Sequence, residues 1–436
     1  MLLIYSPKIS KRLKYICKLI FNDLIGTEFE ITTDSEEFQS FEGIKINYST
    51  KAFDDEIFFY SSNLLFEIGI VGQEIKFIDF EDTKAFFPNY IKKSALAFDP
   101  FAASFFLVSR YEEYLPYVRD KYSRFEAKES IAFKNGFLQK PLVNIYAQEI
   151  AKIISNKFPE FKPKTRNFSF FPTIDIDAAY SYKCKGVFRS FGGYYKSILK
   201  LDFHEILERT EVIFGLKKDP FDTYDYQFKI QKKYELKPIY FILFADYGVN
   251  DKNISVHNFK FQKLIKSFGD YAEVGIHPSF GSNTNPEKLK KEVKKLSQVL
   301  KREITKSRQH FLKLNLPTTY RNLLNLDITD DYTMGYASEP GFRASICDPF
   351  YFYDLDLEIE TNLRIHPFAF MDGTLRDYKQ LSGKESIIII KSLIEEVKKV
   401  KGTFISIWHN ESLSDNKRWK GWRNVYEEMI KDLNHD

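Results

Sequence analysis

The sequence has few features of a disulfide-stabilised, membrane-spanning or nucleic-acid-binding protein. Its 436 residues include only three cysteines, Cys17, Cys184 and Cys347, which form no CxxC pair. Scattered cysteines fit a reducing compartment, so a cytoplasmic location is expected. No apolar stretch approaches the length of a membrane span. Residues 1–8 lack a basic segment followed by an apolar core, so no signal peptide is expected. The net charge of only +4 gives no reason to expect a nucleic acid partner.

The composition is that of a folded globular chain with a sizeable core. Hydrophobic residues make up 44% of it and charged residues 28%. Short mixed runs at 44–48 and 56–60 indicate the strands of a small α+β region. The segment 159–164 is charged and proline-spaced, so we place a domain boundary there. Residues 1–160 then form an N-terminal α+β domain of unknown function, and residues 165–436 form a second domain.

Beyond residue 165 short apolar runs alternate with helical patterns. The runs cover residues 168–174, 239–245, 272–276, 363–370 and 403–408. Helices are expected from Asn285-Pro286 onward and from about Ser386 to Gly402. Alternation of strands and helices predicts a parallel sheet or barrel. A length of about 270 residues is suited to one barrel.

Acidic and imidazole side chains follow the ends of several apolar runs. They are Asp175, Asp177, His277, His310, His366 and His409. In a parallel barrel the strand ends meet at one face, so residues that are distant in sequence converge there. Aspartate and histidine together supply metal ligands and acid–base groups, which indicates a metal-centred hydrolytic site.

Several segments recur in the order of a known family. In the second half they are residues 173–177, 273–280, 307–312, 331–336, 341–344 and 408–413. This half resembles the polysaccharide deacetylase (NodB-homology, carbohydrate esterase family 4) superfamily. Residues 5–7, 98–101 and 109–115 extend the resemblance to a bacterial subgroup with an N-terminal domain of unknown function. The resemblance implies an α/β fold with an irregular (β/α)7 barrel and a divalent metal in its mouth. It also implies removal of N-acetyl or related acyl groups from amino sugars.

The resemblance assigns roles to the strand-end residues. Asp175 would be the general base and Asp177 a metal ligand, in agreement with the different tasks that two tandem carboxylates take beside a cation. His277 matches the first histidine of the family's His-x-x-x-His motif, but Gly281 stands at the second position. His310 is therefore the candidate third ligand; the alternative is that it supports a ligand or contacts the substrate.

The remaining catalytic roles fall on residues from three later motifs. Arg308 matches the arginine that orients the base, and a guanidinium there would keep Asp175 ionised. His409 matches the general acid that protonates the leaving nitrogen. Asp331 roughly matches the acid that tunes this histidine, and Asp327 or Asp330 could hold that role instead.

Further residues are expected near the substrate, namely Asp246, Arg343, Asp372 and Trp408. The two acids either bind sugar hydroxyls or cap the segments that follow them. The arginine and the tryptophan either stack on a sugar or pack within the barrel. His366 has no place in the general family pattern.

Our leading hypothesis is a metal-dependent hydrolase that removes an acyl group from an amino sugar in a glycan or glycan precursor. Zinc is the default metal for these ligand types, although cobalt, nickel or manganese can occupy such sites. The expected partner is the carbohydrate substrate, and the sequence predicts no oligomeric state. The alternative, favoured by Gly281, is a barrel that has lost hydrolysis and serves as a glycan-binding or scaffold module. A third hypothesis is an unrelated metal hydrolase on another α/β fold.

Overall fold

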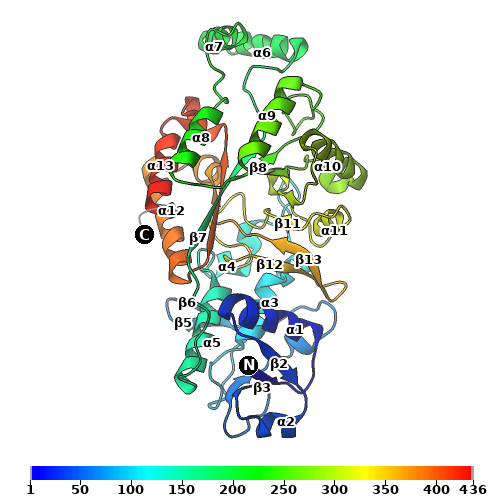
Figure 1. Ribbon diagram of the computed structural model, residues 1–436, viewed down its shortest axis with the longest axis vertical. Helices are drawn as coiled ribbons and strands as arrows, with labels where there is room; N and C mark the ends of the chain where they lie inside the picture. The colour runs from blue at the N-terminus through cyan, green and yellow to red at the C-terminus, as the bar shows by residue number, and fades with distance from the viewer. Residues whose placement is uncertain (1, 434–436) are drawn as a thin grey trace.

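The computed structural model describes residues 2–433, so residues 1 and 434–436, at the outer ends of the two predicted domains, lie outside it. The molecule is elongated (Figure 1). A small sheet lies at one end, a larger sheet with flanking helices occupies the middle, and helices α6 and α7 project at the other end. Within the described residues no helix is long and apolar enough to cross a membrane.

The N-terminal part is built on a four-stranded sheet with the order β2-β1-β3-β4. The strands are β1 (Leu2–Tyr5), β2 (Phe29–Thr32), β3 (Ile44–Ser49) and β4 (Ile57–Tyr60). All three pairings are parallel, so this sheet is of the α/β type and the prediction of an α+β region is wrong for it. The reason is the connections. Segments that contain helices join β1 to β2 and β2 to β3, and the non-helical residues 50–56 join β3 to β4. Each connection brings the chain back in the same direction, whereas tight hairpins would have reversed it.

Helices and one short hairpin complete this part of the chain. The helices are α1 (Lys11–Cys17), α2 (Ser35–Ser40), α3 (Pro100–Val108), α4 (Ile131–Lys134) and α5 (Leu142–Lys157). Strands β5 (Phe77–Phe80) and β6 (Thr83–Phe86) pair antiparallel. Asp99 begins α3, because its carboxylate accepts hydrogen bonds from the backbone N–H groups of Phe101 and Ala102.

The larger sheet has nine strands in the order β12-β13-β11-β10-β9-β8-β7-β15-β14, and only the β12–β13 pairing is antiparallel. The strands are β7 (Ser169–Ile176), β8 (Ile239–Ile242), β9 (Glu273–Ile276), β10 (Lys306–Ser307), β11 (Asp330–Asp331), β12 (Phe350–Asp354), β13 (Ile359–Ile365), β14 (Phe370–Met371) and β15 (Thr403–His409). This confirms the prediction of a mostly parallel sheet. The predicted run 363–370 is divided between two strands, β13 and β14.

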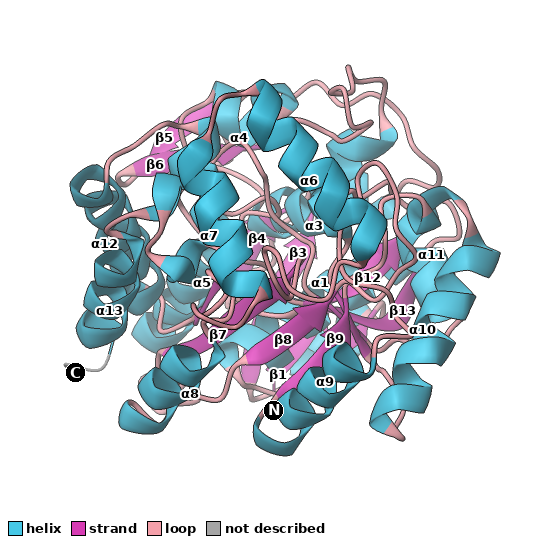
Figure 2. Cartoon of the chain, turned by 90° about the horizontal axis from the view of Figure 1, so that it is seen from above, coloured by secondary structure: helices cyan, strands magenta, loops and turns pink. Residues whose placement is uncertain are grey.

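Helices connect these strands, and except for the projecting α6 and α7 they lie along the outside of the sheet. They are α6 (Val187–Leu199), α7 (Phe203–Ile213), α8 (Tyr224–Lys233), α9 (Phe259–Tyr271), α10 (Pro286–Leu300), α11 (Thr318–Leu324), α12 (Gly383–Lys399) and α13 (Trp422–Leu433). Figure 2 shows β7, β8 and β9 side by side, with α8, α9 and α10 following their outer side. Asn285 caps α10 and Pro286 is its first residue, as the sequence predicts.

The two parts of the chain share one core. The ring of Tyr15 in α1 lies 4.9 Å from that of Tyr353 in β12, and the guanidinium of Arg12 forms a buried ion pair with Glu358. A single hydrophobic cluster contains residues from both parts. Elements of the N-terminal part are therefore fixed relative to the ends of the large sheet.

Candidate metal centre

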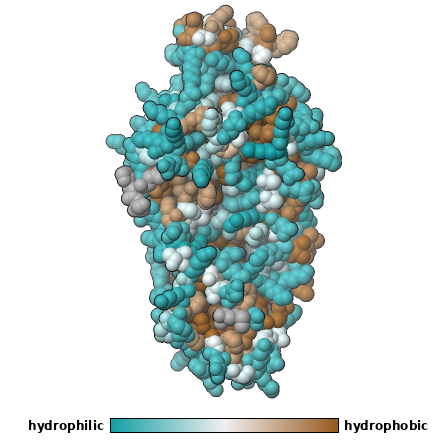
Figure 3. Space-filling view, in the orientation of Figure 1, coloured by the Kyte–Doolittle hydropathy of each residue, from teal (hydrophilic) through white to brown (hydrophobic). Residues whose placement is uncertain are grey.

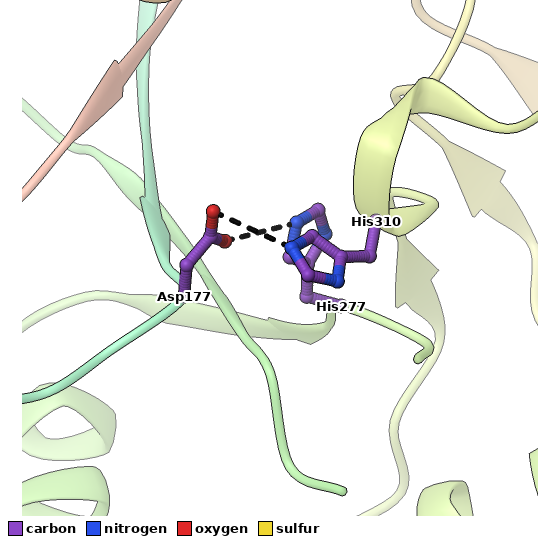
Figure 4. A group of neighbouring side chains, drawn as sticks. All are labelled: Asp177, His277 and His310. Atoms are coloured by element: carbon purple, nitrogen blue, oxygen red, sulfur yellow. Dashed lines mark ion pairs between the residues drawn. The ribbon is translucent and has the colours of Figure 1, made fainter. Parts of the chain in front are cut away.

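The structure brings together three side chains that follow three strands of the large sheet, β7, β9 and β10. Asp177 follows β7, His277 follows β9, and His310 begins a short 3-10 turn, η6 (His310–Leu312), after β10. Figure 4 shows both imidazoles directed toward the carboxylate. The Nε2 atom of His277 lies 3.2 Å from Oδ1 of Asp177, and Nε2 of His310 lies 3.5 Å from Oδ2. One ligand atom from each residue lies within 4.8 Å of the other two, so the three form a candidate metal group.

The geometry of this group fits a divalent cation. Four ligand atoms at about 2.0–2.1 Å from zinc in a tetrahedron are separated by roughly 3.4 Å, which is close to the two nitrogen–oxygen distances. The Oδ1 atom of Asp177 is buried and accepts no hydrogen bond from any described residue. Such an oxygen is costly to bury unless a cation or a donor meets it.

Both imidazoles are held in the orientation that a metal requires. Nδ1 of His277 hydrogen-bonds to the backbone carbonyl of Arg308, and Nδ1 of His310 lies 2.9 Å from Oδ1 of Asp251. When Nδ1 donates, Nε2 keeps its lone pair, which here faces Asp177. Asp251 is a residue that the sequence analysis missed. It lies on the same loop as the predicted Asp246, and nothing in the local sequence distinguishes the two.

Electrostatics couple the three side chains when no cation is present. Burial by itself would lower the pKa of His310, but the carboxylates of Asp177 and Asp251 raise it to about 9. Burial by itself would raise the pKa of Asp177, yet the imidazoles of His310 and His277 hold this pKa well below the usual range. The negative charge of the carboxylates in this site must therefore be compensated, either by protons on the imidazoles or by a cation.

Asp175 lies beside this group and is fixed by Arg308. Nη1 of the buried Arg308 is 2.7 Å from Oδ1 of Asp175, and its Nε donates to the carbonyl of Tyr332. The guanidinium also lies over the ring of Phe241, 4.4 Å from its centroid. The other oxygen of Asp175 is 3.9 Å from Nε2 of His277. This carboxylate is thus held in a fixed orientation next to the candidate metal group.

On the opposite side His409 is paired with Asp372. Nδ1 of His409 lies 2.7 Å from Oδ1 of Asp372, and the backbone N–H of the same histidine donates to Oδ2. Nε2 is 3.7 Å from Oδ2 of Asp177. Burial acts to lower the pKa of His409, but Asp372, Asp177 and Asp175 raise it to about 10. The imidazole therefore carries a proton toward the candidate group.

The pairing of His409 corrects the prediction for Asp331. Asp331 is fully buried, and its carboxylate accepts hydrogen bonds from the hydroxyl of Ser307 and from the backbone and hydroxyl of Thr333. It therefore fixes the chain after β10 and β11, whereas Asp372 is the acid that holds the imidazole of His409. Asp330, one of the alternatives for this role, pairs instead with His366.

The remaining predicted substrate residues do not face the candidate metal group. Trp408 is fully buried against Trp422 and Tyr426, because side chains alternate along β15 and that of His409 points to the other face. Asp246 is exposed and pairs with surface lysines of α10. Arg343 is buried and forms an ion pair of 2.6 Å with Glu113 of the N-terminal part.

The candidate group opens into a cleft of about 240 Å³, and an adjoining chamber of about 800 Å³ shares Leu312 and Tyr378 with its lining. Arg124, from the N-terminal part, lines both. Its Nη1 donates to the carbonyl of Phe311 at 2.7 Å, and its Nη2 donates to the hydroxyl of Tyr378 at 3.3 Å. Phe311 and Leu312 have φ angles of +60° and +53°, a conformation that needs such support. The N-terminal part therefore braces the turn that carries His310.

Gly281 and His366 lie outside the cleft. His310, which follows the neighbouring strand β10, lines the cleft together with His277. His366 pairs with Asp330 at 2.6 Å and lines a different cavity, at the ends where β7, β8 and β9 begin. Three of the four strand-end histidines thus converge, and the fourth does not.

Comparisons with known proteins add little to this geometry. Residues 2–159 match the model of a family described as "Family of unknown function (DUF7033)". No curated protein matches the chain. One similar solved structure is described as "putative polysaccharide deacetylase from Mycobacterium smegmatis". It shares 12% identity and a TM-score of 0.42, over 63% of this chain and 86% of that one. An identity and a TM-score this low do not assign a function to this chain, so the function proposed below rests on its own residues.

Proposed function

We propose that the chain is a metal-dependent hydrolase that removes an N-acetyl or related acyl group from an amino sugar in a glycan or glycan precursor. One observation carries the proposal. A candidate metal group, Asp177, His277 and His310, lies between an arginine-held carboxylate and a carboxylate-held imidazole in one cleft. Amide hydrolysis needs this combination of an electrophile, a base and an acid. The proposal includes an irregular (β/α)7 barrel over residues 165–436 and a cytoplasmic location.

Asp177, His277 and His310 would hold the metal, and zinc suits their mixed oxygen and nitrogen ligands. The ion would supply a Lewis acid for the acyl carbonyl and for water. Asp251 and the carbonyl of Arg308 keep the two imidazoles in register for this task.

The chain's own residues carry the proton transfers. Asp175, oriented by Arg308, takes a proton from the attacking water as the water oxygen bonds to the acyl carbon. His409 gives its proton to the amide nitrogen as the carbon–nitrogen bond breaks, and Asp372 stabilises the cationic imidazole before that step. The products are a carboxylic acid and a free amino sugar. A pKa near 10 keeps His409 in the acid form at neutral pH.

The cleft is suited to a carbohydrate. Besides the charged groups it is lined by the exposed ring of Tyr378, which offers a flat face to a sugar, by the edge of the largely buried Trp419 and by the carboxylate of Glu411. The adjoining chamber adds Tyr122 and Phe125 from the N-terminal part. The two spaces together are larger than one monosaccharide needs, so an oligosaccharide or an extended precursor is the preferred substrate.

Metal content and acetate release test the proposal. Protein dialysed against zinc should retain close to one equivalent, and His277→Ala or His310→Ala should lose it. His366→Ala is the matched control, because it removes a carboxylate-paired imidazole from the other end of the sheet. Wild-type protein should release acetate from N-acetylglucosamine oligomers only when metal is present. Zinc retention without hydrolysis of any acylated glycan would favour the glycan-binding alternative, and zinc retention by both variants would remove the proposed site.

A further inference from the structure

The helical hairpin formed by α6 and α7 has an exposed apolar surface. Among the described residues, 28 large hydrophobic side chains are exposed, and 12 of them lie between residues 187 and 216. Phe188 is 94% exposed and Leu216 is 81% exposed. Figure 3 shows hydrophobic colour gathered at the end of the molecule where Figure 1 places α6 and α7. Apolar surface of this extent on a soluble fold marks a contact with something else.

The hairpin is not covered by the rest of the chain. On α6 only Ser197 is buried, and on α7 only Glu208, Arg209 and Val212 are. The two helices pack mainly on each other, so their outward faces have no partner within residues 2–433. Hydrophobic residues on these faces alternate with polar ones at helical spacing, which gives two short amphipathic helices.

The charge of the hairpin indicates the chemistry of the missing partner. Residues 183–218 contain eight Lys and Arg against four Asp and Glu, a net charge of +4, which equals the net charge of the whole chain. Three of the four acids are already occupied, because Asp202 caps α7, Glu205 pairs with Arg209 and Glu208 binds Lys217. Lys196 and Lys200, beside the exposed Ile198 and Leu199, form no ion pair with any described residue.

We propose that this hairpin docks the protein on an anionic membrane surface, with the apolar side chains entering the interface and the lysines contacting lipid phosphates. Aromatic and aliphatic residues beside basic ones are the pattern of helices that lie in the lipid headgroup region. A second copy of the chain is a poorer partner, since two such segments, each with a net charge of +4 over residues 183–218, would repel one another. The proposal does not depend on the proposed function.

The hairpin is placed beside the mouth of the cleft. Arg189 of α6 donates to the backbone carbonyls of Lys252 and Asn253, immediately after Asp251, the partner of His310. At the base of α7, Glu208 accepts a hydrogen bond from Asn416, in the loop that follows His409. Docking through the hairpin would therefore hold the cleft close to the membrane surface.

Co-sedimentation of the full chain with vesicles tests the inference. Vesicles of phosphatidylcholine mixed with phosphatidylglycerol should bind wild-type protein, and vesicles of phosphatidylcholine alone should bind it more weakly. The double variant F188S/F191S should weaken binding by about tenfold or more. K196Q/K200Q should weaken binding only to the anionic vesicles. Ile68→Ser, at an equally exposed apolar residue of the N-terminal part, is the matched control and should bind like wild type.

Two further measurements keep the test decisive. Unchanged thermal midpoints would show that the variants fold. Unchanged zinc content of F188S/F191S and unchanged vesicle binding of His277→Ala would show that docking and the metal site are independent. Failure of wild-type protein to bind anionic vesicles, or equal binding by F188S/F191S, would overturn the inference. The inference would also be overturned if the wild-type protein did not bind vesicles but formed a dimer in sedimentation equilibrium, and if F188S/F191S abolished that dimer. The face would then be a subunit interface.

Discussion

Replacement of Asp251 is the sharpest test of how the candidate metal centre is built. Its carboxylate is buried, lies 2.9 Å from Nδ1 of His310 and also accepts the backbone N–H of Phe280. Loss of a carboxylate that orients a ligating histidine typically costs about 10- to 100-fold in metal affinity, or roughly 1.4–2.7 kcal/mol. Asp251→Ala removes both the hydrogen-bond acceptor and the negative charge, so its loss of zinc affinity should lie at the upper end of this range. Asp251→Asn keeps an acceptor, so its loss of zinc affinity should lie at the lower end.

Competition titration with a chromogenic zinc chelator measures this effect directly. Asp246→Asn is the matched control, because it removes a carboxylate from the same loop that pairs only with surface lysines of α10. Its zinc affinity should equal that of wild type. Thermal midpoints of the metal-free proteins would show whether the Ala variant has lost the loop as well. Equal zinc affinities for wild type, Asp251→Ala and Asp251→Asn would refute the assignment of His310 as a ligand held by Asp251.

Three other predictions follow from the same geometry. Arg308→Lys cannot keep the guanidinium contacts to both Asp175 and the carbonyl of Tyr332, so turnover should fall by about 100-fold or more while zinc content stays near one equivalent; a normal rate would show that the base needs no such support. Asp372→Asn should lower kcat by about 100- to 10,000-fold, again with zinc retained, because it offers an amide in place of the carboxylate that stabilises protonated His409; a loss confined to KM would contradict the acid role. Zinc affinity should rise with pH by about tenfold per unit between pH 6 and 8, because the pKa of His310 is about 9 in the metal-free protein and its proton must leave before zinc binds; titrations at a series of pH values that show no slope would contradict this.

The sequence predicts the large sheet better than the small one. Residues 168–174 and 403–408 are continuous apolar runs, and they form the adjacent strands β7 and β15, buried from both faces for most of their length. The N-terminal strands are only four to six residues long, and their runs have no feature that separates parallel from antiparallel pairing. Direction there depends on how the connecting segments pack, which is a tertiary property.

The same distinction applies to the site. Asp177 and His277 directly follow strands and His310 comes three residues after one, so the alignment of parallel strands brings them to one edge, as the sequence analysis expected. The partners that hold them come from loops. Whether Asp246 or Asp251 turns inward after β8, and whether Asp331 or Asp372 reaches His409, is decided by backbone geometry over a few residues. Residue type and spacing do not encode that choice.

Residues 1–160 have a structural part in the candidate centre that no motif indicates. The turn that carries His310 continues through two residues with positive φ, and neither is glycine. A conformation of this kind costs about 1–3 kcal/mol per residue and persists only when neighbouring contacts hold it. The contact here is Arg124, whose guanidinium is fixed by Asp120 and reaches the carbonyl of Phe311. Since the metal ligand and its brace lie in different parts of the chain, a fragment that begins near residue 165 would carry all the candidate ligands without the support that positions one of them.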